Sequence, residues 1–191
     1  MTTDILPTRD ALIEAGLTLL IEEGPKGLTL RRAAARAGVS HAAPAHHFKG
    51  LPGLQTAIAT RAFAIFTEAM IRRRDRAEAT PFGRLLGICE GYLDFATERA
   101  GLFHVMFNCP DLNPADPALQ REREAAYSVL RAACLPFTGQ ADRLTEGLVW
   151  SSVHGYAMLG FQRSGGQAGQ DAPPFRDFLA RIVDPAFSAP R

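Results

Sequence analysis

The segment LTLRRAAARAGVSHAAPAHHFK, residues 28–49, predicts two short helices joined by a tight turn. Thr29 can cap the first helix, because its hydroxyl can accept a hydrogen bond from a free amide of the first turn. Gly38 can end that helix, since glycine adopts the left-handed conformation at little steric cost. Val39 is then a single apolar residue, and Ser40 is expected to cap the second helix. This order of cap, helix, turn and second cap indicates a helix-turn-helix.

The second helix is expected over residues 41–47, where the outward side carries imidazole and methyl groups but no acid. Imidazoles can donate to or accept from base edges, and alanine can contact a thymine methyl group. Residues 24–49 contain five basic side chains and no aspartate or glutamate, which suits contacts with phosphates. We therefore expect this helix to enter the DNA major groove. The expected DNA contacts are Thr29, Arg31, Arg32, Ser40, His41, Ala42, Ala43, Ala45, His46, His47 and Lys49. A solvated basic face on an ordinary helical domain is the alternative.

Pro44 conflicts with a regular helix that starts at His41. At the fourth helical position, a proline lacks the amide that would bond back to the cap. The second helix must therefore be short and tight at its start.

Residues 9–66 resemble the DNA-binding domain of the TetR family of bacterial regulators, with an opening helix, Gly24, the run LTLRRAAARAGVS and a short helix that ends in HHF. The residues that carry the resemblance are Thr29, Ala34, Ala37, Gly38, Val39, Ser40, His47 and Phe48. The HAAP of residues 41–44, together with Trp150 and His154-Gly155, resembles a subset with a WHG-type C-terminal domain. The resemblance implies a repressor and favours a small-molecule pocket.

Two positions depart from this family's pattern. The family usually has an aromatic residue, which reaches a phosphate or a base, where this chain has Ala45. It usually has a lysine, which anchors the DNA backbone, where this chain has Leu51. Lys49 can substitute for that lysine from two residues earlier, so operator affinity or sequence preference is expected to differ from the family norm.

The composition is that of an ordinary soluble protein with a sizeable core, since 47% of the 191 residues are hydrophobic and 21% are charged. Cys89, Cys109 and Cys134 match neither a disulfide framework nor a zinc pattern, so reduced thiols are expected. The opening MTTDILPTRD carries acids and lacks the apolar region of a signal sequence. No segment approaches the roughly 18 unbroken apolar residues of a membrane span. A cytoplasmic protein that binds no cofactor and no membrane is expected.

Apolar residues recur at helical spacing through the rest of the chain, with no strand-type alternation and no internal repeat. We predict an all-α fold of roughly nine helices. Beyond the motif, the expected helices are residues 8–23, 52–78, 81–100, 101–110, 117–137, 141–163 and 175–187, with a loop over 164–174. Two domains are expected: a TetR-type helix-turn-helix domain over residues 6–66, and a ligand-binding and dimerisation domain over residues 67–191.

The helix expected over residues 141–163 has one face of apolar and small side chains, formed by Leu148, Ser152, Gly155 and Leu159. The last helix adds Phe175, Phe178, Leu179 and Ile182. Because small residues let a partner helix approach closely, these two helices predict a four-helix bundle across a two-fold axis. A homodimer also follows from the motif, since paired DNA-binding domains about 34–36 Å apart reach successive major grooves of a palindromic operator. An internal monomer core is the alternative.

Aromatic and sulfur-containing residues in the second half have the usual composition of a small-molecule pocket. They are Cys89, Tyr92, Phe103, Met106, Phe107, Tyr127, Trp150, His154 and Met158. Plain core packing is the alternative for each of them. A ligand that prefers a dimer with wrongly spaced DNA-binding domains would lower operator affinity, with the long helix over residues 52–78 as the lever. The sequence thus predicts a repressor that an unidentified, largely apolar effector releases from DNA.

Other classes of protein fit parts of the sequence. His41, His46 and His47 cluster, but chelation from one helix needs i, i+4 spacing, and residue 45 is alanine. His104 and Cys109 have no second pair nearby, so no metal site is predicted. No phosphate loop, GxSxG elbow or tuned carboxylate pair indicates a catalytic residue. The alternative functions are a helical adaptor that binds only protein and a small metal-binding protein without DNA binding.

Overall fold

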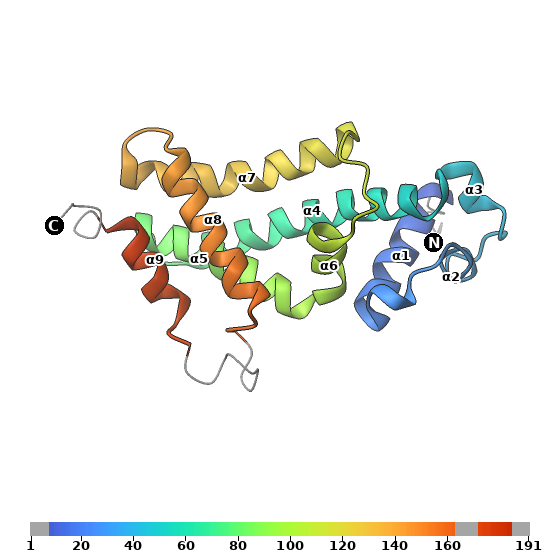
Figure 1. The fold of residues 1–191 in the computed structure, drawn as a ribbon, viewed down its shortest axis with the longest axis horizontal. Coiled ribbons are helices and arrows are strands. Elements are labelled where there is room, and N and C mark those ends of the chain that lie inside the picture. The colour runs from blue at the N-terminus through green and yellow to red at the C-terminus, as the bar shows by residue number, and fades with distance from the viewer. Residues whose placement is uncertain (1–7, 163–171, 185–191) are drawn as a thin grey trace, which may run out of the picture. The chain divides into compact units, whose positions relative to one another are not determined.

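The computed structural model describes residues 8–162 and 172–184, which form nine α-helices, one short 3-10 helix and no strand (Figure 1). In chain order they are α1 (Thr8–Glu23), η1 (Pro25–Gly27), α2 (Leu30–Arg36), α3 (Ala43–His47), α4 (Gly50–Arg76), α5 (Pro81–Glu98), α6 (Ala100–Asn108), α7 (Pro117–Thr138), α8 (Arg143–Met158) and α9 (Phe175–Val183). The all-α prediction is confirmed. Most of the loop predicted over residues 164–174 lies outside the described residues.

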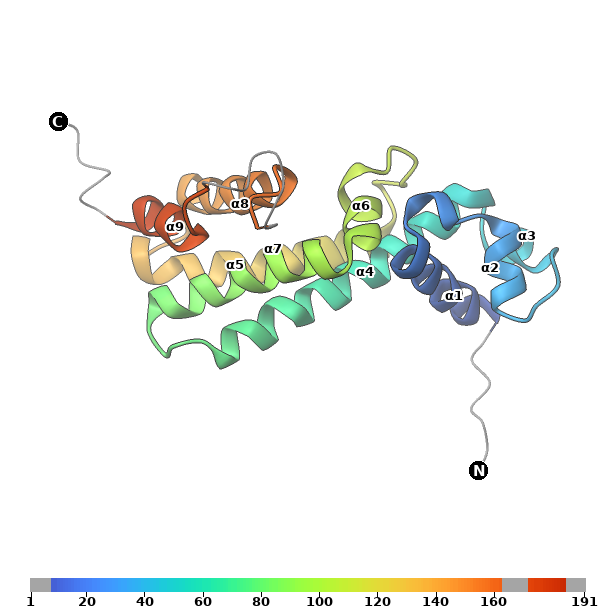
Figure 2. The same ribbon diagram turned by 90° about the horizontal axis from the view of Figure 1, so that it is seen from below.

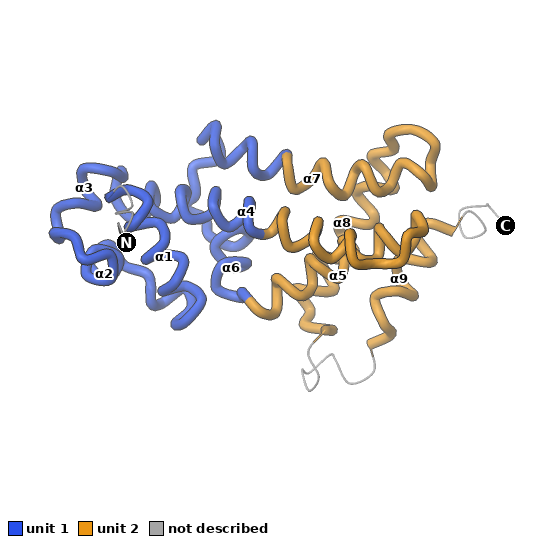
Figure 3. The backbone as a smooth tube through the Cα atoms, turned by 180° about the vertical axis from the view of Figure 1, so that it is seen from behind, with its two compact units in different colours: residues 1–65, 99–124 blue, residues 66–98, 125–191 orange. Residues whose placement is uncertain are grey.

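The described residues divide into two compact units (Figure 3). The first unit holds residues 8–65 and 99–124, and the second holds residues 66–98 and 125–184, apart from the gap. α1, α2, α3 and α6 lie wholly in the first unit, whereas α4 and α7 each continue from one unit into the other. The domain division at residues 66 and 67 stays a prediction.

α1 is the centre of the first unit, where it contacts η1, α2, α3 and α6. The residues Ile13, Gly16, Leu17 and Leu20, which recur at helical spacing along it, are buried. A β-carbon at Gly16 would overlap the Ile58 side chain, and one at Gly101 would overlap the Leu20 carbonyl oxygen. Glycine is therefore needed at Gly101, where the overlap is with backbone, whereas a larger residue at Gly16 would need only the end of the Ile58 side chain to move.

In the second unit, the last part of α4 runs beside α5 (Figure 2). A β-carbon at Gly91 of α5 would lie 2.9 Å from the Met70 Cα atom, so the two backbones nearly touch. The Phe66 ring packs edge-on against Tyr92, with centroids 4.9 Å apart. Phe66 and Met70 are both 0% exposed, so this contact forms the apolar core of the unit.

α9 packs on α8 within the second unit. The centroid of the Tyr156 ring lies 5.3 Å from that of Phe175 and 5.6 Å from that of Phe178. Phe175 is 5% exposed and Leu179 is 0% exposed. Phe175 and Leu179 therefore pack within their own unit, whereas Phe178 and Ile182 of the same helix are only half-buried, and the surface between two copies stays a prediction.

Candidate nucleic-acid interface and effector site

The first helix of the motif begins and ends as predicted. The Thr29 hydroxyl accepts a hydrogen bond from the Arg32 amide at 3.2 Å, which caps α2. Gly38 has a φ of 67°, in the left-handed region that ends a helix. Ala33 and Ala34 are both 0% exposed, and their small side chains let α2 pack closely. α2 is thus a fixed base for the turn that follows.

The second helix begins at Ala43 rather than His41 and has only five residues. Its N-cap is Ala42, and the Ser40 carbonyl, not the hydroxyl, accepts a hydrogen bond from the Ala43 amide at 3.0 Å. The prediction that Ser40 caps this helix is therefore wrong. Pro44 explains the shift: in the first turn of the helix its missing amide would have no intrahelical acceptor in any case.

The side chains around α3 divide into an anchored set and an exposed set. Pro44 is buried, and Phe48 is 7% exposed with the Arg9 Cζ atom 5.6 Å from its ring centroid. Of the eleven predicted DNA contacts, only Ala43 is half-buried. The exposed ones are Thr29, Arg31, Arg32, Ser40, His41, Ala42, Ala45, His46, His47 and Lys49. Buried anchors therefore hold a short helix whose outward side chains are free to meet a ligand.

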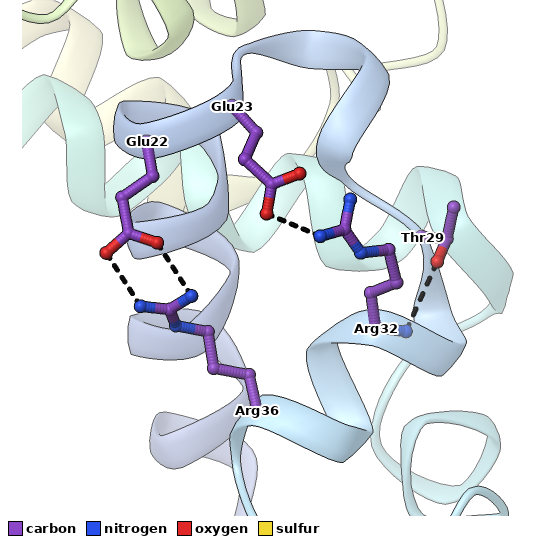
Figure 4. Close-up of polar contacts among 5 residues, drawn as sticks. All are labelled: Glu22, Glu23, Thr29, Arg32 and Arg36. Atoms are coloured by element: carbon purple, nitrogen blue, oxygen red, sulfur yellow. Dashed lines mark hydrogen bonds and ion pairs between the residues drawn. The ribbon is translucent and has the colours of Figure 1, made fainter.

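Two arginines of the motif are paired with acids at the end of α1 (Figure 4). Arg36 binds the Glu22 carboxylate through two nitrogens, each at 2.7 Å, and Arg32 binds Glu23. The Arg32 hydrogen bond holds the pKa of the Glu23 carboxyl below its usual range. The sequence reasoning missed these acids because they precede Gly24, outside the segment whose charges it compared.

The remaining basic residues of the motif keep their charge available. Among the described residues, no carboxylate lies within 4 Å of the side-chain nitrogens of Lys26, Arg31 or Lys49. All three side chains are exposed. The positive charge available to DNA is thus smaller than the five basic residues of the motif suggested, because two of them are paired with acids. Arg31 and Lys49 supply most of the remaining positive charge near α3.

The second unit brings together four residues of the predicted ligand set. The Trp150 ring centroid lies 5.8 Å from that of Tyr92 and 6.0 Å from that of Tyr127. The Tyr92 hydroxyl and His154 Nδ1 are 2.6 Å apart, which joins α5 to α8 by a hydrogen bond. Burial lowers the pKa of His154 and raises that of Tyr92, so both groups are uncharged at neutral pH. Cys89, also on α5, is 0% exposed.

Glu146 is a member of this region that the sequence reasoning missed. It is 2% exposed and accepts a hydrogen bond from the Tyr127 hydroxyl at 2.6 Å, and this bond raises the pKa of Tyr127. Glu146 lies four residues before Trp150, and Trp150 lies four before His154, so all three share one face of α8. That spacing was the signal available in the sequence.

The other members of the predicted set lie elsewhere. Phe103, Met106 and Phe107 belong to α6 in the first unit, where the Phe107 ring centroid is 5.5 Å from that of Phe63. Met158 is 50% exposed at the end of α8 and is not part of the buried core. Of the predicted ligand set, Tyr92, Tyr127, Trp150 and His154 therefore contact one another in the second unit, and Glu146 joins them through Tyr127.

α8 also presents large apolar side chains to the solvent. They are Leu144, Leu148, Met158 and Leu159, which are 71%, 46%, 50% and 61% exposed. A β-carbon at Gly147 or Gly155 would have no atom within 4 Å, so these two positions on α8 are open as well. Exposed leucines beside bare glycines on one helix are typical of a surface that another helix covers.

Within residues 8–162 and 172–184, no group of three or more His, Cys, Asp or Glu side chains could hold a metal ion. None of the helices described here combines the length and apolar character needed to cross a membrane.

A family model described as the C-terminal domain of tetracyclin repressor-like proteins matches residues 85–184. A solved structure of a protein of unknown function from Rhodococcus sp. RHA1 has 23% identity and a TM-score of 0.73, covering 95% of this chain and 94% of that chain. The TetR family transcriptional regulator PfmR from Thermus thermophilus has 20% identity and a TM-score of 0.63, covering 93% and 96%. The transcriptional regulator FadR from Bacillus subtilis, in complex with stearoyl-CoA, has 14% identity and a TM-score of 0.65, covering 91% and 97%. No curated protein sequence matches this chain.

Proposed function

This chain belongs to the TetR family of DNA-binding transcriptional regulators, and we propose that it is a dimeric repressor which a small, largely apolar ligand releases from a palindromic operator. The observation that carries the proposal is the exposed set of side chains on and before α3, held by Pro44 and Phe48. His41, Ala42 and His46 are suited to base edges, because they offer two imidazoles and a methyl group without a negative charge.

Phosphate contacts are assigned to the basic and hydroxyl side chains around these base contacts. Arg31 and Lys49 supply the main positive charge, because no carboxylate of the described residues pairs with them. Arg32 shares its charge with Glu23, so we assign it a smaller contribution. The chain has Ala45 and Leu51 where the family usually has an aromatic residue and a lysine. Lys49 is therefore expected to replace that lysine as the main contact with the DNA backbone.

The apolar face of α8 supports the dimer. Leu144, Leu148, Met158 and Leu159 are too exposed to stabilise a monomer, and burying them against the same face of a second copy would remove apolar surface from water. Two copies then present two α3 helices, and a separation of about 34–36 Å would place them in successive major grooves.

The cluster of Tyr92, Tyr127, Trp150 and His154 supports an effector site, because aromatic walls with a few polar groups suit a largely apolar ligand. The FadR structure, a fold neighbour, contains stearoyl-CoA. α4 runs through both units and is the proposed lever between ligand and DNA. A coupling free energy of about 3 kcal/mol would weaken operator binding roughly 150-fold.

Selection of bound duplexes from a random pool tests the DNA-binding proposal. We expect an inverted repeat whose half-sites lie about 10–10.5 base pairs apart, or a multiple of that, with binding that falls steeply as salt rises. An Ala42→Glu variant should bind no duplex, because it adds a negative charge on the exposed turn. If no duplex is enriched and none binds at low ionic strength, the proposal is wrong.

The effector proposal has a direct optical test, because Trp150 is the only tryptophan in the chain. Stearic acid and stearoyl-CoA are suitable first probes. Binding at the cluster should change the Trp150 emission and weaken binding to the selected operator at the same concentrations. Tyr92→Ala should remove both effects. An emission change without loss of operator binding would contradict a role in induction.

A further inference from the structure

One groove in the first unit shares His47 and Lys49 with the proposed DNA contacts, and its other lining residues have no part in the function proposed above. It has a volume of about 410 Å³, and its walls come from α1, the end of α3, one side of α4 and the segment that leads into α7. The apolar part of its wall includes Phe48, Pro52 and Ala57. A groove of this size can hold a small molecule, so its charges decide what kind.

Three basic side chains gather around Phe48. The Arg9 Cζ atom is 5.6 Å from the Phe48 ring centroid, and Phe48 is flanked in sequence by His47 and Lys49. All three line the groove and are exposed. Among the residues that the structure describes, Arg9 pairs with one acid, Asp10, at 3.8 Å; both side chains are more than half exposed, so the pair is weak. α4 begins directly after Lys49, and the amides of its first turn add partial positive charge.

The acid in the same groove is already engaged. The Asp116 carboxylate accepts hydrogen bonds from the Ala118 and Leu119 amides at 3.0 and 2.9 Å, which caps the start of α7. The neighbouring Asn113 amide donates to the Thr56 hydroxyl at 3.0 Å. Thr56 is 5% exposed, so this bond is shielded from water and holds the loop against α4. The groove therefore has a fixed wall on this side, where Asp116 contributes one negative charge, and the two cations Arg9 and Lys49 near Phe48 outnumber it.

We propose that this groove binds the phosphate group of a small molecule, with the phosphate held by Arg9, Lys49 and His47 and the rest of the ligand lying along α4. A phosphate suits the site because its several oxygens can accept bonds from separate donors at once. A consequence rests on the proposed function: Lys49 and His47 are also predicted DNA contacts, so the ligand and the operator exclude each other. This site would act on DNA binding by competition, independently of the aromatic cluster in the second unit.

Isothermal titration of the full chain with pyrophosphate, in the absence of DNA, tests the site. We expect saturable binding that Arg9→Gln and Lys49→Gln each weaken about tenfold, the usual loss for one hydrogen bond to a charged group. Arg121→Gln is the matched control, because Arg121 is exposed on α7 in the same unit and does not line the groove. Acetate at equal ionic strength should not bind.

A competition experiment with a duplex then separates the sources of phosphate. At constant ionic strength, pyrophosphate should displace the duplex from the unmodified chain and much less from Arg9→Gln. If pyrophosphate does not bind but Arg9→Gln still weakens DNA binding, the phosphate is that of the DNA backbone and the small-molecule site is wrong. Pyrophosphate binding that all variants share overturns it too. Pyrophosphate binding by a chain that binds no duplex would instead leave the groove standing and overturn the proposed function.

Discussion

Polar side chains pair in both units of this molecule, but they do so in different surroundings. In the first unit, the side chains of Arg32 and Glu23 are 45% and 38% exposed, and those of Arg36 and Glu22 are 38% and 49% exposed. In the second unit, Glu146 is 2% exposed and its partner Tyr127 is half-buried. Water screens the exposed ion pairs of the first unit. In the buried pair of the second unit, the hydrogen bond between Tyr127 and Glu146 replaces the hydrogen bonds to water that both groups lost on folding.

This difference in solvent exposure gives paired polar side chains a different role in each unit. An exposed ion pair stabilises a fold little, but it decides how much positive charge a DNA-binding surface has available. A buried pair adds no surface charge, but breaking it leaves a carboxylate without a donor in a site that water does not reach. Stability should therefore depend on the pairs of the second unit, and affinity for DNA on those of the first.

The largest effect on stability is expected from Tyr127→Phe. The substitution keeps the ring and removes the hydroxyl that donates to the buried Glu146 carboxylate. We expect the free energy of unfolding, measured in urea, to fall by about 2 kcal/mol. Tyr156→Phe is the control, because it removes the same atom from a bond to the neutral Pro173 carbonyl. Equal losses for the two variants would show that the charge of Glu146 contributes nothing.

A smaller effect is expected from a helix cap in the first unit. Thr29→Ala removes the hydroxyl that accepts the Arg32 amide and should cost about 1 kcal/mol in thermal or urea unfolding. Ser40→Ala should cost almost nothing, because the Ser40 hydroxyl caps no helix. Similar losses for the two variants would mean that the second helix begins two residues earlier than the structure has it.

The pH dependence of stability should come from the second unit. Burial lowers the pKa of His154 below its ordinary 6.5, so the unfolded chain takes up this proton more readily than the folded one. The contribution of His154 is then fully present above pH 6.5 and is lost as the pH falls below it. Urea unfolding between pH 5 and 8 should show this slope, and His154→Gln should flatten it. His104→Gln, an exposed site on α6, should leave the slope unchanged; a slope that His104 controls would refute the assignment.

Local chemistry explains which parts of the fold could be predicted from the sequence. The cap at Thr29 and the stop at Gly38 depend on the residues themselves and their nearest neighbours, and both are confirmed. Ser40 has the same preference as Thr29, but Pro44 moved the start of α3 past it. A local rule therefore failed where a second local rule, acting a few residues away, opposed it.

Contacts between distant segments explain what could not be predicted. The grouping of α6 with the first unit depends on Gly101 meeting the Leu20 carbonyl oxygen, 81 residues away in the chain (101 minus 20). Met158 is predicted from the sequence to line a pocket, yet it lies at the surface, since helical spacing does not say which side of α8 the rest of its unit covers. Glu22 and Glu23 reach Arg36 and Arg32 across the turn between α1 and α2, a pairing that no spacing rule within one helix indicates.

The smallest effect on stability, and the sharpest test of the two roles, is expected from the double variant Glu22→Gln, Glu23→Gln. Both pairs are exposed, so the midpoint of urea unfolding should hardly move. Arg32 and Arg36 would lose their carboxylate partners and become available to phosphates. Affinity for a duplex of arbitrary sequence should then rise, and the slope of log affinity against log salt should steepen by about 0.9 for each arginine that reaches a phosphate. Glu68→Gln is the control, since it breaks the exposed pair with Arg72 on α4, away from the motif. An unchanged salt slope in the double variant would mean that Glu22 and Glu23 only position α2 against α1. The ion pairs of the first unit would then serve the fold, as the buried pair of the second unit does, and would not set the charge available to DNA.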